Sequence, residues 1–241
     1  MARAYTQRRK YYDEAVLGAR RKFALPSLII SLHNKLKKWA KSPHEIAFNL
    51  LEPGQKILDI GCGDGQFLAL VKDKFNELYG IDISPLAIEK ARNYCLQMGV
   101  GERLKLILWD VENGLPFEDS IFDAVTCLAV LEHVFYPPSL LKEISRVLKV
   151  GGVLVLQVPN DVWLLYRIQF LLGKIPHSGG IDDLGYDWGH LHKFSKEIIE
   201  KLLTSCNFSI STLLCSGVFP NLRKVWLSLL GGDIIVKAVK N

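Results

Sequence analysis

The chain has 241 residues, a formal net charge of +5 at pH 7 and five cysteines, and its length suits one α/β domain with a sizeable core. An odd number of cysteines without a C-x-x-C pair argues against a disulfide scaffold or a zinc ribbon and indicates a reducing compartment. No apolar stretch approaches the ~20 residues that cross a membrane, and no signal peptide is recognisable, so we expect a cytoplasmic protein.

The positive charge is concentrated at the N-terminus. Residues 1–41 hold 11 Lys and Arg against 2 acidic residues, whereas the remainder of the chain holds 19 against 23. The pattern predicts a helical extension or lid over residues 1–51 and a main domain over residues 52–241. A basic extension of this kind allows peripheral contact with an anionic membrane and leaves RNA binding as an alternative.

The first expected strand of the main domain ends in a glycine turn. An apolar run containing Asp59 leads into Gly61, Gly63 and Gly65. A helical pattern follows, whose apolar face is expected to hold Phe67, Leu68, Val71 and Phe75. Such a turn lets backbone approach a ligand at the helix N-terminus. The spacing departs from G-x-G-x-x-G, and Asp59 and Asp64 would repel a pyrophosphate. The turn therefore favours S-adenosylmethionine (SAM), which carries an ammonium and a sulfonium but no phosphate.

Further strands follow along the chain, separated by helical patterns. Asp82 ends the second strand 21 residues after Gly61, where a ribose-binding carboxylate belongs. The third strand stops at Asp110, and a helix over residues 139–148 ends at a glycine pair before a fully apolar strand of the kind buried in parallel sheets. An insertion or lid over about 160–189 contains an amphipathic segment. Strands are expected at residues 56–60, 78–83, 104–109, 122–128, 153–158, 208–216 and 233–239.

With these elements in place, the sequence resembles the class I SAM-dependent methyltransferases. The matching motifs are LDIGCGDG, YGIDIS, WDVENGLPF, FDAVTCLAVLEHV and LLKEISRVLKVGGVLVLQVPN, which cover about residues 50–160 in the family's order. Within the family, the chain is most similar to small-molecule enzymes that include the ubiquinone-biosynthesis O-methyltransferases. The resemblance implies an α/β, Rossmann-like three-layer sandwich around a seven-stranded, mostly parallel sheet whose last strand is antiparallel.

The resemblance also implies how the cofactor SAM is held. Asp59 would lie under its methionine end and Asp82 would accept both ribose hydroxyls. Asp110 would bind the adenine amino group, with the Val111 N–H near the ring, and the backbone of Leu128 would line the methionine end. Asp59, Asp82 and Asp110 could instead have a structural role only, as a loop residue or a helix cap. The expected cofactor-binding residues are Asp59, Gly61, Gly63, Gly65, Asp82, Ile83, Asp110, Val111 and Leu128.

Three histidines lie on the expected acceptor side. His133 follows Glu132 after the fourth strand, and in the ubiquinone-biosynthesis enzymes the matching stretch carries a further acid that helps bind a divalent metal. Ala129 stands at that position here, and one glutamate is too little carboxylate for a hard cation, so we expect no metal. His133 and His192 are the candidates for a general base, although His133 could instead fix the start of a helix. His190 is expected in a structural role or in the pocket wall.

The sequence therefore predicts methyl transfer from SAM to a small-molecule acceptor, which the apolar segment in the insertion allows to be lipid-like. Two alternatives remain open: an NAD-linked Rossmann oxidoreductase, and a non-catalytic SAM-fold protein that binds membrane or RNA through its basic N-terminus. DNA amino-methylation is not expected, because the fourth strand is not followed by a polar Asn-Pro-Pro-Tyr-like motif. The acceptor and the oligomeric state cannot be predicted from the sequence.

Overall fold

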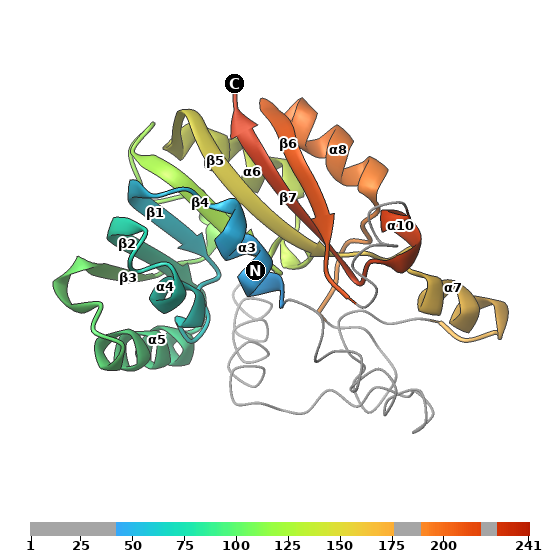
Figure 1. Cartoon of the computed structure of the whole chain (residues 1–241), viewed down its shortest axis with the longest axis horizontal. Coiled ribbons are helices and arrows are strands. Elements are labelled where there is room, and N and C mark those ends of the chain that lie inside the picture. Colours follow the sequence, from blue (N-terminus) through green and yellow to red (C-terminus); the bar gives the residue numbers. More distant parts are fainter. Residues whose placement is uncertain (1–41, 176–188, 218–225) are drawn as a thin grey trace.

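The computed structural model describes residues 42–175, 189–217 and 226–241. Its centre is a seven-stranded sheet with the strand order β3-β2-β1-β4-β5-β7-β6 (Figure 1). β7 pairs antiparallel with both β5 and β6, and the other pairs are parallel, which confirms the predicted sheet. The strands are β1 (Gly54–Ile60), β2 (Phe75–Asp82), β3 (Leu104–Leu108), β4 (Phe122–Leu128), β5 (Leu148–Pro159), β6 (Phe208–Cys215) and β7 (Asp233–Lys240).

Helices cover both faces of this sheet and complete the three layers (Figure 1). One hydrophobic cluster joins a sheet face to α3, α4 and α5, with Phe67 and Cys95 among its buried residues. A second cluster joins the opposite face to α6 and α8, with Leu141 and Leu203 among its buried residues. The helices are α3 (Pro43–Leu50), α4 (Gln66–Leu70), α5 (Pro85–Gln97), α6 (Pro137–Val147), α7 (Leu164–Leu171), α8 (Lys196–Ser205) and α10 (Leu227–Leu230), with short 3-10 turns η1 (Gly101–Arg103), η2 (Val111–Asn113) and η3 (Leu131–His133).

The strand order identifies the edge at which a ligand is expected. The chain builds outward from β1 through β2 to β3 on one side, and from β4 to β5 on the other. In open α/β sheets, ligands bind at the carboxyl ends of the strands where the order reverses. That position lies at the ends of β1 and β4, where Asp59 pairs with Thr126 and Ile60 with Cys127.

Two helix predictions need correction. α4 ends at Leu70, and Phe75, expected on its apolar face, is instead the first residue of β2, where it is 2% exposed. α6 ends at Val147, and β5 begins at Leu148 rather than at Val153. β5 begins earlier than predicted because it contains a β-bulge. It pairs with β4 on both sides of a register shift that accommodates the glycine pair.

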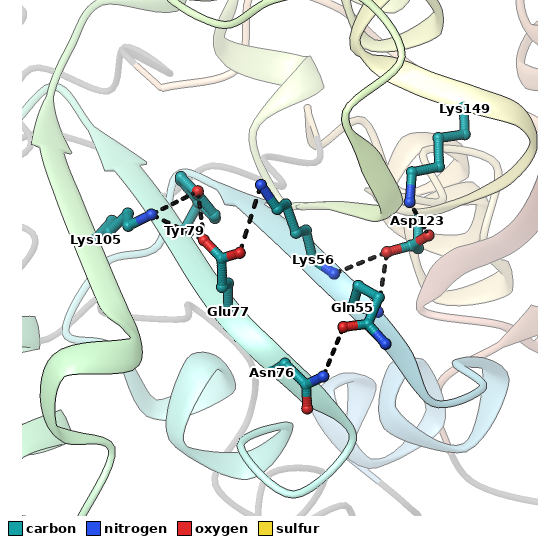
Figure 2. Close-up of polar contacts among 8 residues, drawn as sticks. All are labelled: Gln55, Lys56, Asn76, Glu77, Tyr79, Lys105, Asp123 and Lys149. Atoms are coloured by element: carbon teal, nitrogen blue, oxygen red, sulfur yellow. Dashed lines mark hydrogen bonds and ion pairs between the residues drawn. The ribbon is translucent and has the colours of Figure 1, made fainter.

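The opposite edge of the sheet, where the parallel strands begin, carries a network of charged side chains (Figure 2). The Asp123 carboxylate accepts the backbone N–H groups of Gln55 and Lys56 and pairs with Lys149 at 2.5 Å. Burial raises the pKa of Asp123, but these partners outweigh it, so the net pKa is lowered. The network therefore fastens the starts of β1, β4 and β5 to one another.

The flanking segments are described in part. A capping box starts α3, since the Ser42 hydroxyl accepts the Glu45 N–H and the Glu45 carboxylate accepts the Ser42 N–H. Residues 1–41 and 176–188, which contain most of the predicted extension and half of the predicted insertion, lie outside the described residues, so the domain division stays a prediction. Within the described ranges, no helix has the length and apolarity needed to span a bilayer. All five cysteines are free and buried.

Candidate cofactor and acceptor site

The glycine turn after β1 depends on backbone that only glycine adopts easily. Gly61, Gly63 and Gly65 all have positive φ, at 70°, 53° and 81°. A Cβ on Gly61 would lie 2.3 Å from the Val130 side chain, and one on Gly65 would lie 2.9 Å from the Cys95 sulfur. Among the residues that the structure describes, a Cβ on Gly63 would meet nothing within 4 Å. Packing therefore requires glycine at positions 61 and 65, while the described residues leave space beside Gly63.

Asp82, at the end of β2, is bound directly to this turn. Its Oδ2 accepts the Gly63 N–H and its Oδ1 accepts the Ser84 N–H, each at 2.9 Å. The carboxylate thus joins the glycine turn to the start of the segment after β2. The predicted role on the ribose hydroxyls fits this geometry, because the turn and the carboxylate form one unit.

Asp59, at the end of β1, is a buried acid. It is 3% exposed, and its Oδ1 accepts the Thr126 hydroxyl at 2.7 Å. Burial raises its pKa to about 7, the nearby Asp82 charge adds to the rise, and the Thr126 hydrogen bond opposes it. A cation above the turn would stabilise the charged form, so Asp59 fits a ligand whose nearest end is positive.

The other predicted cofactor residues lie at the ends of neighbouring strands. The Trp109 N–H bonds the Asp82 carbonyl at 2.8 Å, which brings Asp110 beside the end of β2. The Asp110 carboxylate caps η2 by accepting the Glu112 N–H at 3.0 Å. Ile83, Val111 and Leu128 are half-buried around the same edge. The structure thus assembles the predicted set at one place, and the individual contacts stay predictions.

One residue near the turn escaped the sequence reasoning. His44, in the first turn of α3, packs edge-on against Phe67 with 5.5 Å between ring centroids. Burial lowers its pKa, while the Asp64 charge opposes that change. His44 lies two residues after the helix-capping Ser42, and this local sequence gave no indication that α3 reaches the glycine turn.

On the acceptor side, β4 leads into a strained connection. Ala129 has a φ of 56°, a left-handed value that is unfavourable for any residue with a Cβ. Its N–H bonds the Gln157 carbonyl on β5 at 3.1 Å, which holds it in place. The strained residue directly precedes Val130, which packs against Gly61 of the glycine turn, and backbone strain often occurs at a functional site.

The segment after residue 188 is bonded to this connection. The Leu191 N–H donates to the Glu132 carbonyl at 2.8 Å, and His133 Nδ1 bonds the Gly189 carbonyl. His192 Nε2 lies 3.0 Å from the Val134 carbonyl. Because carbonyls only accept, both imidazole nitrogens must be donors, so each ring has a structural bond beside its predicted role as a base. Neither catalytic role is tested by these contacts.

His190 lies close to a buried carboxylate. Its Nε2 is 4.0 Å from Glu132 Oε1, and the two side chains are only 5% and 2% exposed. The His190 ring also packs edge-on against His133 with 4.9 Å between centroids. The sequence offered the pattern Gly-His-Leu-His but gave no signal that it would fold back onto the Glu-His pair.

Comparison with known proteins agrees with this geometry. Residues 58–156 match a family model described as a methyltransferase domain. A ubiquinone biosynthesis O-methyltransferase from Alkalilimnicola ehrlichii is 37% identical over 128 residues, which cover 51% of each chain. A sterol 4-C-methyltransferase from Caenorhabditis elegans is 35% identical over 120 residues, which cover 49% of this chain and 36% of that one. The chain therefore spans about half or less of the length of these curated relatives.

A solved structure is similar over most of the chain. A SAM-dependent methyltransferase from Methanosarcina mazei is 27% identical, with 83% of this chain and 98% of that chain covered and a TM-score of 0.61. These matches favour methyl transfer over the NAD-linked and non-catalytic alternatives.

Proposed function

Because the chain belongs to the class I SAM-dependent methyltransferase family, we propose that it transfers a methyl group from SAM to a small-molecule acceptor. The observation that carries the proposal is the bond between the glycine turn and Asp82, at the point where the strand order reverses, with space beside Gly63 among the described residues. This arrangement places half-buried backbone and a carboxylate side by side, which suits a ribose linked to a positively charged chain.

The residues present fit this cofactor. The Gly63 backbone and Asp82 would hold the nucleoside part, Asp110 the adenine, and Asp59 would favour the cationic methionine end. When bound, SAM supplies an electrophilic methyl group on sulfur. The protein would contribute mainly by holding the acceptor in line with that methyl and by excluding water. An oxygen nucleophile also has to lose its proton, which requires a base on the acceptor side.

An apolar or lipid-like acceptor is supported by the surface at the same sheet edge. α7 follows the carboxyl end of β5, and Phe170, Leu171 and Leu172 at its end are 71%, 84% and 70% exposed. The similar proteins act in ubiquinone biosynthesis and on sterols, as their names state. These apolar side chains, together with the basic sequence of residues 1–41, also support peripheral contact with an anionic membrane.

The test is a methylation assay with isotope-labelled SAM and full-length protein. The acceptors would be a hydroxylated prenyl-benzoquinol, a sterol, a water-soluble catechol and a total cell extract, with products identified by mass spectrometry. We expect label in a small organic product, with the apolar acceptors favoured over the catechol. Binding of SAM and S-adenosylhomocysteine is measured in parallel by calorimetry. Failure to bind either ligand would refute the proposal.

A further inference from the structure

A cavity of about 500 Å³ lies between α7, α8, β6 and α10. Its α10 wall is fastened to the carboxyl end of β5, because the Asn160 side chain donates to the carbonyls of Ser228 and Gly231, at 3.0 and 2.7 Å. The cavity thus belongs to the same edge of the sheet as the glycine turn, on the side of β6. The side chains that line it include Arg167, Lys196, Glu200, Leu213, Trp226 and Leu227.

The charged groups of the cavity are two cations and one acid. Arg167 donates its Nε–H to the Val162 carbonyl at 2.7 Å, and no carboxylate of the described residues pairs with its terminal nitrogens. Lys196 Nζ lies 3.6 Å from Glu200 Oε1, in a pair whose side chains are 44% and 40% exposed. Because water screens such a pair, the lysine can share a bound anion with Arg167. A guanidinium presents its N–H groups as a planar fork that matches a phosphate, so the cavity suits a phosphate group.

Exposed apolar side chains flank the cavity on α7 and before α10. None of the eight residues of α7 is buried, although most of them are apolar, and the helix projects from the body of the protein (Figure 1). Phe170 and Leu171 follow Arg167 by three and four residues, which places them on the same side of the helix, and they are 71% and 84% exposed. Trp226, in the opposite wall, is 64% exposed. Apolar surface of this kind indicates an apolar partner outside the chain.

The combination of a phosphate-binding cavity and exposed apolar side chains beside it matches an anionic lipid in a bilayer. A helix with an apolar face lies in the membrane interface with that face among the acyl chains, and tryptophan is enriched at the level of the head groups. A soluble phosphate compound would account for the two cations but not for the apolar side chains. A protein partner would account for the apolar side chains but would not need the cationic cavity.

We propose that the cavity holds the phosphate of an anionic lipid, while Phe170 and Leu171 enter the apolar layer of the bilayer. The proposal rests on the membrane contact proposed above and names the site that makes it. Arg167 and Lys196 bind the phosphate oxygens, and Trp226 lies among the head groups. Bound in this way, the carboxyl edge of the sheet is turned toward the bilayer, which is the source of a lipid-like acceptor.

The binding test measures flotation of the full-length protein with vesicles of phosphatidylcholine, alone and mixed with phosphatidylglycerol. Arg167→Gln is compared with Lys201→Gln, which removes an exposed charge from α8 outside the cavity. We expect Arg167→Gln to lower the affinity for the mixed vesicles about fivefold, and Lys201→Gln to stay within about twofold of wild type. Residues 1–41 are present in every protein, so the difference reports on the cavity rather than on the basic N-terminus.

A matched pair of apolar variants tests the insertion of α7. Leu171→Ser should weaken binding to both kinds of vesicle, whereas Val150→Ser should not, because Val150 is 77% exposed near the start of β5, at the opposite edge of the sheet. α7 has no buried residue, so Leu171→Ser should keep the wild-type melting temperature. Vesicles with brominated acyl chains should quench the tryptophan fluorescence of wild type, and Trp226→Phe should lose part of that quenching.

The outcomes separate the lipid site from the methyltransferase function. Calorimetry without vesicles should give the same S-adenosylhomocysteine affinity for wild type and Arg167→Gln. If wild type binds this ligand but not the mixed vesicles, or if Arg167→Gln binds those vesicles as tightly as wild type, the lipid site is wrong and the proposed function stands. If wild type binds neither SAM nor S-adenosylhomocysteine but binds vesicles through Arg167, the proposed function fails alone. Binding of glycerol 3-phosphate that depends on Arg167, with vesicle binding unchanged in Arg167→Gln, would instead make the cavity a site for a soluble phosphate compound.

Discussion

Replacing Asp59 with asparagine should weaken SAM binding and remove most of its pH dependence between pH 6.0 and 7.5. The wild-type carboxyl is buried, with a pKa of about 7 in the ligand-free protein. A cationic ligand binds the charged form better, so ligand binding has to draw a proton off this group at low pH. For a pKa of about 7, the charged fraction is roughly 9% at pH 6.0 and 76% at pH 7.5. Wild-type affinity should therefore rise about eightfold over this range.

Calorimetry at several pH values, repeated in buffers of different ionisation enthalpy, measures both the affinity and the protons released. The upper limit of pH 7.5 keeps most of the ligand's own amino group charged. An asparagine Oδ1 can still accept the Thr126 hydroxyl, so the fold should survive the change. A wild-type affinity that is flat with pH, or an Asn variant with the same slope, would refute the reasoning.

The raised pKa of Asp59 also determines how Asp59→Asn changes the stability of the ligand-free protein. A carboxyl whose folded pKa lies above its ordinary value near 3.8 favours the folded state only while protonated. Its contribution to stability is therefore lost as the pH rises from about 4 through about 7. At pH 7.5, ligand-free Asp59→Asn should melt at or above the wild-type temperature, although it binds SAM less tightly.

Three further predictions concern the turn and the two sheet edges. Gly61→Ala should lower the melting temperature strongly, because its Cβ would collide with Val130. Gly63→Ala should cost only about 1–2 kcal/mol of backbone strain and should mainly weaken SAM binding. Equal losses of stability in the two variants would contradict this. Asp82→Ala should weaken SAM by ~2–3 kcal/mol in calorimetry of a folded variant, since a charged acceptor of hydrogen bonds is removed. Asp123→Ala should cost about 1–3 kcal/mol in urea unfolding, because two backbone N–H groups lose their acceptor, and it should leave SAM affinity unchanged.

The parts of the site that could be predicted are those with a local signature. Three glycines at alternating positions indicate a turn with positive φ, which Gly61, Gly63 and Gly65 adopt. An acid at the end of an apolar strand indicates a ligand-binding carboxylate, which identified Asp82 as a candidate. The position of each strand end then follows from the parallel sheet. Local pattern sufficed here because each signal and the structure it specifies lie within a few residues of one another.

The contact between Glu132 and His190 had no such signature. The two residues are distant in the chain, and they meet because backbone groups around Gly189 and Leu191 bond to the turn after β4. The misplaced end of α4 has a related cause, since Phe75 fits a helical apolar face equally well. Its burial in β2 is decided by the neighbouring strand rather than by its own segment.

The polar groups at the two edges of the sheet differ in their effect on the free energy of folding. At the edge where the parallel strands begin, Asp123 and its partners are mutually satisfied, and the contacts stabilise the fold (Figure 2). At the carboxyl edge, the buried Asp59, the buried Glu132 and the left-handed Ala129 each carry a cost. A cationic ligand would offset the cost at Asp59, because its charge stabilises the ionised carboxyl. The costly groups therefore lie at the edge where the strand order places a ligand, and strain and buried charge tend to gather at functional sites of this kind.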